Sequence, residues 1–312
     1  MEFNVSPKLN GINFADLADK IRKTIKDPVA KTQISTGDEV TTPTEPDQFV
    51  VMPAWWREAT QGLLGLPFGY MVMTAGKPDS GKTSSTIEAI REAQKQGVSV
   101  IWADTERKTT KDRLVAWGVD PTRLARVQAP YLEAMYKGIE RWLNAIKDAD
   151  PEGKVLIVID SIGNTASFRE AEVEDMEGSQ QPGVAAKINK RGLKRLIPRL
   201  ARDKVALYVI NQTYNLMGSP GRKNTGGEGL DYFSALTFQT ARIGWLEKTV
   251  KGQRMRTGAK VKWDIYKSHL ALGNDIMKST IMEITKEGMK VVATAPVKEV
   301  EADSDDDFGL DE

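Results

Sequence analysis

The chain has 312 residues, of which 40% are hydrophobic and 28% charged, with a single histidine and no cysteine. These proportions are typical of a soluble globular protein of one large or two small domains. The lack of cysteine excludes disulfides, thiol catalysis and cysteine metal sites. No apolar run approaches the length of a membrane span, and the N-terminus lacks the basic and apolar regions of a signal peptide. We therefore expect a cytoplasmic protein with no membrane partner.

A net charge of +1 conceals an uneven distribution of charge along the chain. Residues 299–312 carry eight acidic side chains and no basic one, so the remainder of the chain carries +9. A basic body favours a polyanionic partner, with nucleic acid as the first candidate. The composition of residues 299–312 predicts a disordered acidic tail, which we expect to compete with that partner.

The N-terminal part of the chain has a lower density of apolar residues than the part that follows. Apolar residues recur at three- to four-residue spacing over residues 12–26 and predict an amphipathic helix. Residues 31–47 are rich in Thr, Pro and Asp, which is typical of an extended linker. A denser pattern begins at Phe49. We therefore divide the chain into a helix and linker at residues 1–48, a core at residues 49–298, and the acidic tail.

The core alternates between apolar runs typical of strands and longer stretches typical of helices. The predicted strands are residues 70–75, 98–103, 155–160 and 205–211, and the predicted helices are residues 84–96, 131–148 and 184–202. This alternation predicts an α/β fold with a mostly parallel, twisted sheet flanked by helices. Beyond Arg242 the pattern becomes rich in strands and predicts antiparallel strands at the sheet edge. These are residues 260–266, 278–285 and 289–293.

A match to the phosphate-binding motif G-x-x-x-x-G-K-[ST] lies between the first of these strands and its helix. Its eight residues are Gly76, Lys77, Pro78, Asp79, Ser80, Gly81, Lys82 and Thr83. Glycines let the backbone N–H groups point at one spot, Lys82 brings a charge to the β- and γ-phosphates, and Thr83 offers a hydroxyl to Mg²⁺. The strand–loop–helix setting favours an ATP or GTP site over an ordinary glycine turn.

Two predicted strands end in acidic side chains, at the edge of the sheet where ligands bind. Asp160 ends an apolar strand and is placed to hold the water shell of Mg²⁺. Glu106 follows the strand at residues 98–103 and is placed to orient or deprotonate the water that attacks the γ-phosphate. The alternatives are a turn aspartate for Asp160 and a solvated surface acid for Glu106.

A long loop and a basic helix carry the candidate nucleic-acid contacts. Asn211-Gln212 ends the strand at residues 205–211 and is placed to sense the γ-phosphate for the loop that follows. Basic and aromatic residues interleaved in that loop suit a nucleic-acid backbone with unstacked bases, and a disordered surface loop is the alternative. The density of basic residues in the helix at residues 184–202 favours phosphate contact over a solvated face. The candidate DNA-binding residues are Tyr214, Met217, Arg222, Lys223, Gly226 and Gly227 in the loop, and Lys187, Lys194 and Arg195 in the helix.

As an ordered set, these motifs resemble the RecA family of recombination ATPases, close to its bacteriophage UvsX-type members. The resemblance rests on residues 76–83, 104–106, 155–161, 211–212 and 225–227, and it covers about residues 50–290. It implies a RecA-type phosphate-loop ATPase core that binds ATP and Mg²⁺. Glu106 and Lys82 would then be catalytic. Asp160 would support Mg²⁺ through water, and Gln212 would couple ATP to DNA.

The resemblance also implies a helical filament. Loops at about residues 162–183 and 213–227 would hold DNA along its axis, and the N-terminal helix would pack on a neighbouring subunit. Thr110 is a further candidate ATP-binding residue. Lys267-Ser268-His269 resembles the family's Lys-x-Lys, which reaches ATP across the subunit interface. The histidine departs from that pattern, and a neutral structural histidine is the alternative there.

Together these features lead us to expect an ATP-dependent DNA recombinase that forms a filament on single-stranded DNA and exchanges strands with a homologous duplex. Further partners would be a single-strand-binding protein or a loader, in the host bacterial cytoplasm if the protein is phage-encoded. A hexameric DNA helicase, with Arg254 and Arg256 as candidate arginine fingers, is one alternative. An ATP-gated single-strand-binding mediator is the other.

Overall fold

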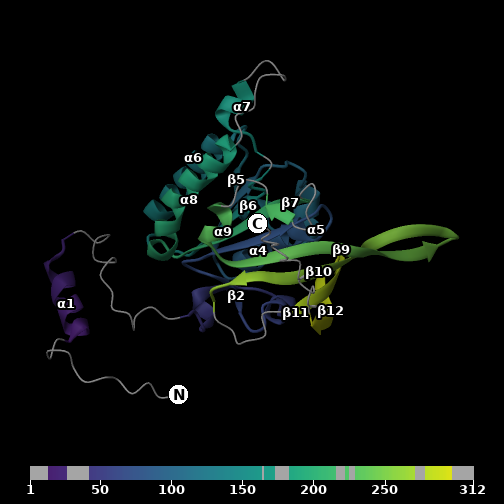
Figure 1. Ribbon diagram of the computed structural model, residues 1–312, viewed down its shortest axis with the longest axis horizontal. Coiled ribbons are helices and arrows are strands. Elements are labelled where there is room, and N and C mark those ends of the chain that lie inside the picture. Colours follow the sequence, from purple (N-terminus) through teal and green to yellow (C-terminus); the bar gives the residue numbers. More distant parts are fainter. Residues whose placement is uncertain are drawn as a thin grey trace, which may run out of the picture.

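A ten-stranded sheet organises the computed structural model (Figure 1). The structure describes residues 13–26, 42–163, 165–172, 183–215, 222–224, 229–270 and 278–296. Several of the residues and segments discussed above lie outside this part of the chain. They are most of the predicted linker, the acidic tail, and much of the two predicted DNA-binding loops (residues 164, 173–182, 216–221 and 225–227), including Met217, Gly226 and Gly227.

The predicted N-terminal helix is present as α1 (Phe14–Thr24). It begins after Asn13, whose side-chain oxygen accepts hydrogen bonds from the backbone N–H groups of Ala15 (3.0 Å) and Asp16 (3.4 Å). Such a cap satisfies backbone donors that have no partner inside the helix. Phe14 and Leu17, on the apolar face of this helix, are exposed to solvent.

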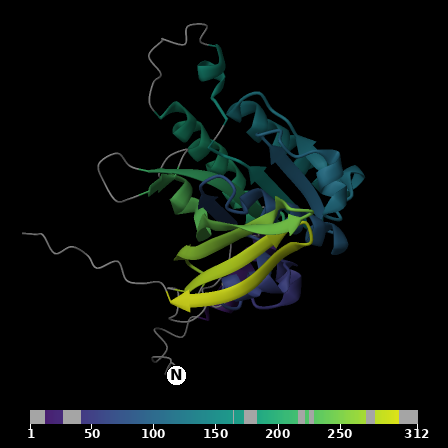
Figure 2. The same ribbon diagram turned by 90° about the vertical axis from the view of Figure 1, so that its right-hand side faces the viewer.

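The main sheet is mostly parallel at its centre and antiparallel at one end, as the sequence predicts. Its strand order is β12 (Gly288–Pro296), β11 (Lys278–Thr285), β10 (Gln253–Ser268), β9 (Ser234–Val250), β3 (Met71–Gly76), β7 (Val205–Asn215), β6 (Val155–Asp160), β4 (Ser99–Asp104) and β5 (Ala125–Val127). All neighbouring pairs from β9 to β5 are parallel, whereas β9 to β12 pair antiparallel. The short β8 (Arg222–Asn224) pairs antiparallel with β7. Figure 2 shows the sheet twisting toward its antiparallel end, drawn in yellow.

Alternate residues of the central strands pack into two separate cores, one on each face of the sheet. Val158 and Tyr208 face the core formed with α3 (Ala54–Ala59) and α4 (Lys82–Lys95). Their neighbours, such as Ile157 and Val209, face the core formed with α6 (Leu132–Ala149) and α8 (Val184–Arg202). Strands buried on both faces are continuous hydrophobic runs, which is why the sequence reveals them.

Shorter elements complete the described part of the chain. They are η2 (Pro46–Gln48), β1 (Phe49–Val51), β2 (Gly65–Pro67), α5 (Lys111–Ala116), η3 (Pro121–Arg123), α7 (Phe168–Glu172) and α9 (Gly229–Phe233). Strands β1 and β2 form a separate two-stranded antiparallel sheet. Among the described helices, none combines the length and the apolar character needed to cross a bilayer.

The structure extends the strand-rich region in a way that the sequence does not predict. β9 begins at Ser234, before Arg242, and its first part lies parallel to β3 with Thr240 opposite Gly76. Its second part turns at Lys251-Gly252 and pairs with β10 in a long hairpin that projects from the body (Figure 1). β9 changes from buried on both faces to largely exposed along its length. No single pattern of hydrophobic residues therefore extends along the whole strand, so the sequence does not reveal it as one element.

The strand register places three predicted site residues, Gly76, Gln212 and Asp160, along one edge of the sheet together with Asp104. Gly76 lies opposite Gln212, and Asp104 lies opposite Asp160. All four stand at or near the carboxyl ends of parallel strands, where ligands bind in open α/β sheets.

Candidate nucleotide-binding site

The loop from Gly76 to Thr83 joins β3 to α4 and has the backbone conformation that its glycines permit. Gly81 has a φ of +89° and stands at the N-cap of α4. Gly76 lies against β9, where an added Cβ would collide with the hydroxyl and carbonyl of Thr240. Larger residues at these two positions would therefore strain or displace the loop. The helix N-terminus behind the loop favours an anion in front of it.

The Lys82 side chain lies inside the loop that precedes it. Its Nζ donates hydrogen bonds to the carbonyl oxygens of Gly76 (2.9 Å) and Lys77 (2.6 Å). Burial lowers the pKa of the ammonium, and the negative charges of Asp160 and Glu106 oppose that effect. The structure thus places this cation where a bound phosphate would meet the loop.

Side chains from distant strands hold the loop from behind. The Ser80 hydroxyl donates to the Lys77 carbonyl (2.8 Å) and lies 2.7 Å from the Thr240 hydroxyl. The Trp263 indole Nε1 donates to the Ser80 carbonyl (3.2 Å). Neither Thr240 nor Trp263 is predicted from the sequence. No local signal could reveal them, because both lie more than 150 residues after the loop.

Asp160 and Thr83 lie within hydrogen-bond distance of each other and bring oxygen atoms to the position where the sequence predicts Mg²⁺. Asp160 is 3% exposed, and burial raises the pKa of its carboxyl group to about 6. A hydrogen bond with Thr83 lowers the pKa and so opposes part of this rise. Within the described residues no group of three or more His, Cys, Asp or Glu side chains is arranged to hold a metal. A cation here would therefore take much of its coordination from water and phosphate, which is how Mg²⁺ usually binds. The oxygen donors at this position fit that ion.

Glu106 receives contacts from three directions at the mouth of the site. Its Oε1 accepts hydrogen bonds from Gln212 Nε2 (3.0 Å) and Ser161 Oγ (3.3 Å), and its Oε2 pairs with Lys108 Nζ (2.8 Å). Burial alone would raise the pKa of Glu106, but these hydrogen bonds and the Lys108 charge hold it below its ordinary value. The side chain is therefore a carboxylate at neutral pH, as a general base requires. Lys108 was not predicted, although its position two residues after Glu106 is a signal that could have revealed it.

A cavity of about 500 Å³ opens in front of these residues, within the size range of small-molecule sites. Residues 78–84, Asp104, Glu106, Asp160 and Gln212 line one part of it. The remaining lining comes from three separate segments. They are Lys108, Thr109, Arg113 and Trp117 around α5, Trp245, Gly258 and Ala259 from the β9–β10 hairpin, and Ile284, Thr285 and Lys286 at the β11–β12 turn.

Five predicted ATP-binding residues lie outside the lining of this cavity: Gly76 and Lys77 of the loop, and Thr110, Lys267 and His269 elsewhere. Thr110 is the N-cap of α5, where its hydroxyl accepts a hydrogen bond from the Arg113 backbone N–H (3.3 Å). Lys267 lies at the end of β10 and its Nζ donates to the Asp231 carbonyl. His269 follows, and its backbone N–H donates to the Ala235 carbonyl (2.7 Å). A role for Lys267 and His269 across a subunit interface stays a prediction.

The candidate DNA-binding residues that the structure describes lie on helix α8 and on strands β7 and β8. Lys187 and Lys194 are exposed on α8, whereas Arg195 forms an ion pair with Glu140 of α6 (2.7 Å). The register of β7 and β8 places Tyr214 opposite Lys223. Arg222 lies opposite Asn215 in the same register. The structure thus brings the loop candidates that it describes into one hairpin.

The RecA N-terminal domain, as a protein family, matches residues 53–289 of this chain. The chain belongs to this family. It is 31% identical over 217 residues to protein RecA of Fusobacterium nucleatum, a match that covers 67% of this chain and 53% of that relative. It is 28% identical over 232 residues to protein RecA of an Arthrobacter species, covering 72% and 62%. The chain thus spans about half the length of the curated RecA relatives it matches, and a special likeness to bacteriophage members stays a prediction.

Proposed function

We propose that this protein is an ATP-dependent DNA recombinase that polymerises on single-stranded DNA and pairs it with a homologous duplex. One observation carries the proposal. In a chain of the RecA family, Lys82, Asp160, Glu106 and Gln212 meet around one cavity at the carboxyl edge of the sheet. A cation, a ligand for Mg²⁺, a general base and an amide are the parts that phosphoryl transfer to water requires.

Each residue around the cavity would have a separate role in ATP hydrolysis. MgATP, when bound, supplies the phosphoanhydride bond that is cleaved. The backbone N–H groups of residues 76–83 and the Lys82 ammonium would hold its phosphates, and Thr83 and Asp160 would hold the cation. Glu106 would orient a water molecule and accept its proton. The hydrogen bond from Gln212 to Glu106 supports a role for Gln212 in reporting the state of the site.

Gln212 also connects the cavity to the proposed DNA-binding segments. It lies in β7, which continues to Asn215 and pairs with β8. We infer that loops at about residues 162–183 and 213–227, with Lys187 and Lys194 on α8, grip DNA when ATP is bound. Residues 1–48 would link neighbouring subunits, Lys267 and His269 would reach the neighbour's nucleotide, and the acidic tail at residues 299–312 would modulate DNA access. The protein would act in the cytoplasm, together with a single-strand-binding protein or loader.

The decisive test is ATP hydrolysis with and without single-stranded DNA. We expect strong stimulation by DNA in the wild-type protein and none in Lys82→Ala, which loses the charge that holds the phosphates. Lys95→Ala is the matched control, because Lys95 lies at the far end of the same helix and pairs with Glu92 (2.9 Å). Wild-type hydrolysis that DNA does not stimulate at low salt would overturn the proposal. Closed rings instead of open filaments in electron micrographs would favour the helicase alternative.

A further inference from the structure

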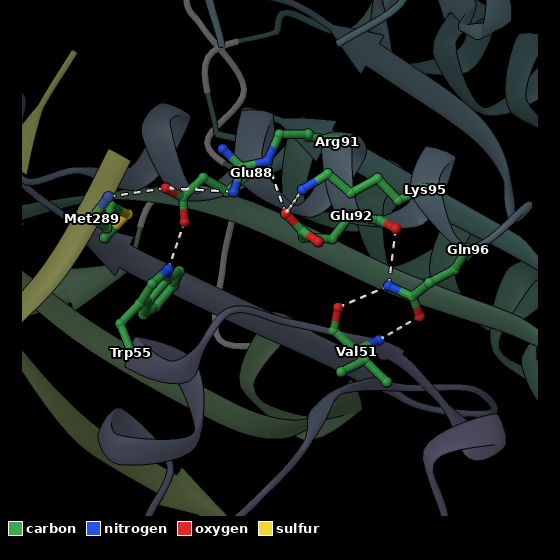
Figure 3. Close-up of polar contacts among 8 residues, drawn as sticks. All are labelled: Val51, Trp55, Glu88, Arg91, Glu92, Lys95, Gln96 and Met289. Atoms are coloured by element: carbon green, nitrogen blue, oxygen red, sulfur yellow. Dashed lines mark hydrogen bonds and ion pairs between the residues drawn. The ribbon is translucent and has the colours of Figure 1, made fainter. Parts of the chain in front are cut away.

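A buried carboxylate that does not line the nucleotide cavity lies on α4, less than two turns after Lys82. Glu88 is 2% exposed and faces α3 and β12 (Figure 3). Acidic side chains are almost never fully buried unless they are paired. Glu88 has no role in the hydrolysis proposed above.

Glu88 joins three elements that are far apart in the sequence. Its Oε2 accepts a hydrogen bond from the Trp55 indole Nε1 of α3 (2.5 Å), and its Oε1 accepts one from the Met289 backbone N–H of β12 (2.9 Å). The Arg91 guanidinium approaches the same Oε1 at 4.0 Å. Figure 3 shows the carboxylate pointing from α4 into the gap between the Trp55 ring and the Met289 backbone. Both oxygens are therefore engaged by donors, as burial of this group requires.

The chain around Met289 is shaped to admit the carboxylate. Gly288 has a φ of +125°, which L side chains rarely adopt, and a Cβ there would lie 2.5 Å from Glu88 Oε1. Burial raises the pKa of Glu88, whereas the Met289 and Trp55 hydrogen bonds oppose that rise. Gly288 leaves room for the Glu88 carboxylate, and the Trp55 and Met289 N–H groups bind its two oxygens.

The strands on either side of this turn also place side chains close to Gly81 of the phosphate-binding loop. A Cβ at Gly81 would collide with Ile284 Cδ1 and would lie 3.7 Å from Met289 Cε. Ile284, Thr285 and Lys286 line the nucleotide cavity, directly before the turn that ends at Met289. The β11–β12 turn is thus a wall of the cavity whose far side is attached to α4 by Glu88.

We propose that Glu88 is a positioning residue for the nucleotide: by holding Met289 it keeps the β11–β12 turn in place as a wall of the cavity. The proposal rests on the proposed function, since it takes the occupant of the cavity to be ATP. It assigns to Glu88 an effect on nucleotide affinity and none on the chemical step.

Glu88→Gln tests this assignment with almost no change in size. An amide has one acceptor oxygen in place of two, and in either orientation its –NH2 group faces one of the two donors, so we expect the amide to be displaced and the contacts with both Trp55 and Met289 to weaken. Glu92→Gln is the matched control, because Glu92 lies one turn further along α4 and pairs with Arg91 (2.8 Å) and Lys95 (2.9 Å), not with the turn (Figure 3). Each variant would be compared with the wild-type protein in two measurements.

The first measurement is hydrogen exchange of the β11–β12 amides without nucleotide, Met289 above all. We expect exchange at Met289 to be about tenfold faster in Glu88→Gln, as loss of one hydrogen bond implies, and unchanged in Glu92→Gln. The second is steady-state ATP hydrolysis, in which KM should rise about five- to tenfold in Glu88→Gln while kcat stays within about twofold. Trp55→Phe, which removes the indole donor together with part of the buried ring, should shift both measurements in the same direction and serves if Glu88→Gln does not fold.

Several results would overturn the proposal. Unchanged exchange and KM in the variants would do so, as would faster exchange without a rise in KM, or a fall in kcat at constant KM. A wild-type protein that binds no ATP would overturn the proposed function and this assignment together. Normal wild-type binding with an unaffected Glu88→Gln would overturn this assignment alone.

Discussion

Glu106 illustrates how single residues in this site depend on neighbours from other elements. Ser161 comes from the end of β6, Gln212 from β7 and Lys108 from the loop that also carries Glu106. Their contacts keep the pKa of the carboxyl group below its ordinary value in spite of partial burial. The group is therefore ionised at neutral pH, which is the form that a general base must have.

At this scale the prediction concerns Glu106→Gln. The amide cannot accept a proton, so turnover of ATP should fall about 10²- to 10⁴-fold, the usual contribution of a general base. ATP affinity, measured with a fluorescent nucleotide, should change only a few-fold, because the groups proposed to hold phosphate and cation are untouched. A normal hydrolysis rate in this variant would remove Glu106 from the catalytic residues and favour the mediator alternative.

At the scale of elements, α4 is held from behind by three aromatic side chains that carry polar atoms. Trp263 donates to Ser80, just before the helix, and Trp55 donates to Glu88 within it. The Tyr208 hydroxyl lies 2.7 Å from Ser85 Oγ and 2.9 Å from Thr74 Oγ1. Large aromatic rings bury much area and, through these atoms, also fix the rotation and depth of the helix.

Tyr208→Phe should therefore destabilise the protein without removing any packed ring. The hydroxyl is fully buried and contacts two other hydroxyl groups, so its loss should cost about 1–2 kcal/mol of unfolding free energy, measured by urea denaturation. Tyr232→Phe is the control, because Tyr232 is 84% exposed and its change should stay within about 0.5 kcal/mol. Equal effects of the two substitutions would contradict the bracing role of Tyr208.

The surroundings of the loop at residues 76–83 show which parts of the site the sequence can predict and which it cannot. Residues 76–83 and the apolar run ending at Asp160 are local patterns, and the structure places both where the patterns indicate. The contact between Glu106 and Gln212 joins residues 106 positions apart, and the one between Ser80 and Thr240 joins residues 160 positions apart. Such pairs follow from strand order and register, which no local window contains. For the same reason the parallel part of β9 was missed.

For the whole molecule, the face of the sheet that α8 covers carries exposed basic side chains. Helix α8 presents exposed lysines on the face opposite α4. Arg195 is already paired with Glu140, so Lys187 and Lys194 are the better candidates for phosphate contact. Long-range attraction of this kind weakens as salt is added, because phosphate contacts release counterions.

Lys187→Ala and Lys194→Ala should each weaken binding of single-stranded DNA. Each should also reduce the slope of log affinity against log salt concentration by about 0.7, the value for one lost contact on a single strand. Fluorescence anisotropy of a labelled oligonucleotide over a salt series measures both quantities. Lys95→Ala, on the opposite face, should change neither. Slopes identical to wild type in both α8 variants would exclude these lysines from the DNA path.

The packing of late strands against the phosphate-binding loop has a consequence for the protein's biogenesis. A ribosome completes residues 76–83 well before it makes Thr240 or Ile284, which later lie against Gly76 and Gly81. The growing chain therefore passes through a stage at which β3 and α4 exist without the segments that hold the loop and enclose its cavity. The segments that hold the loop are thus among the last of the described core to be synthesised, so we expect the loop to reach its final arrangement only after β9 and β11 are complete.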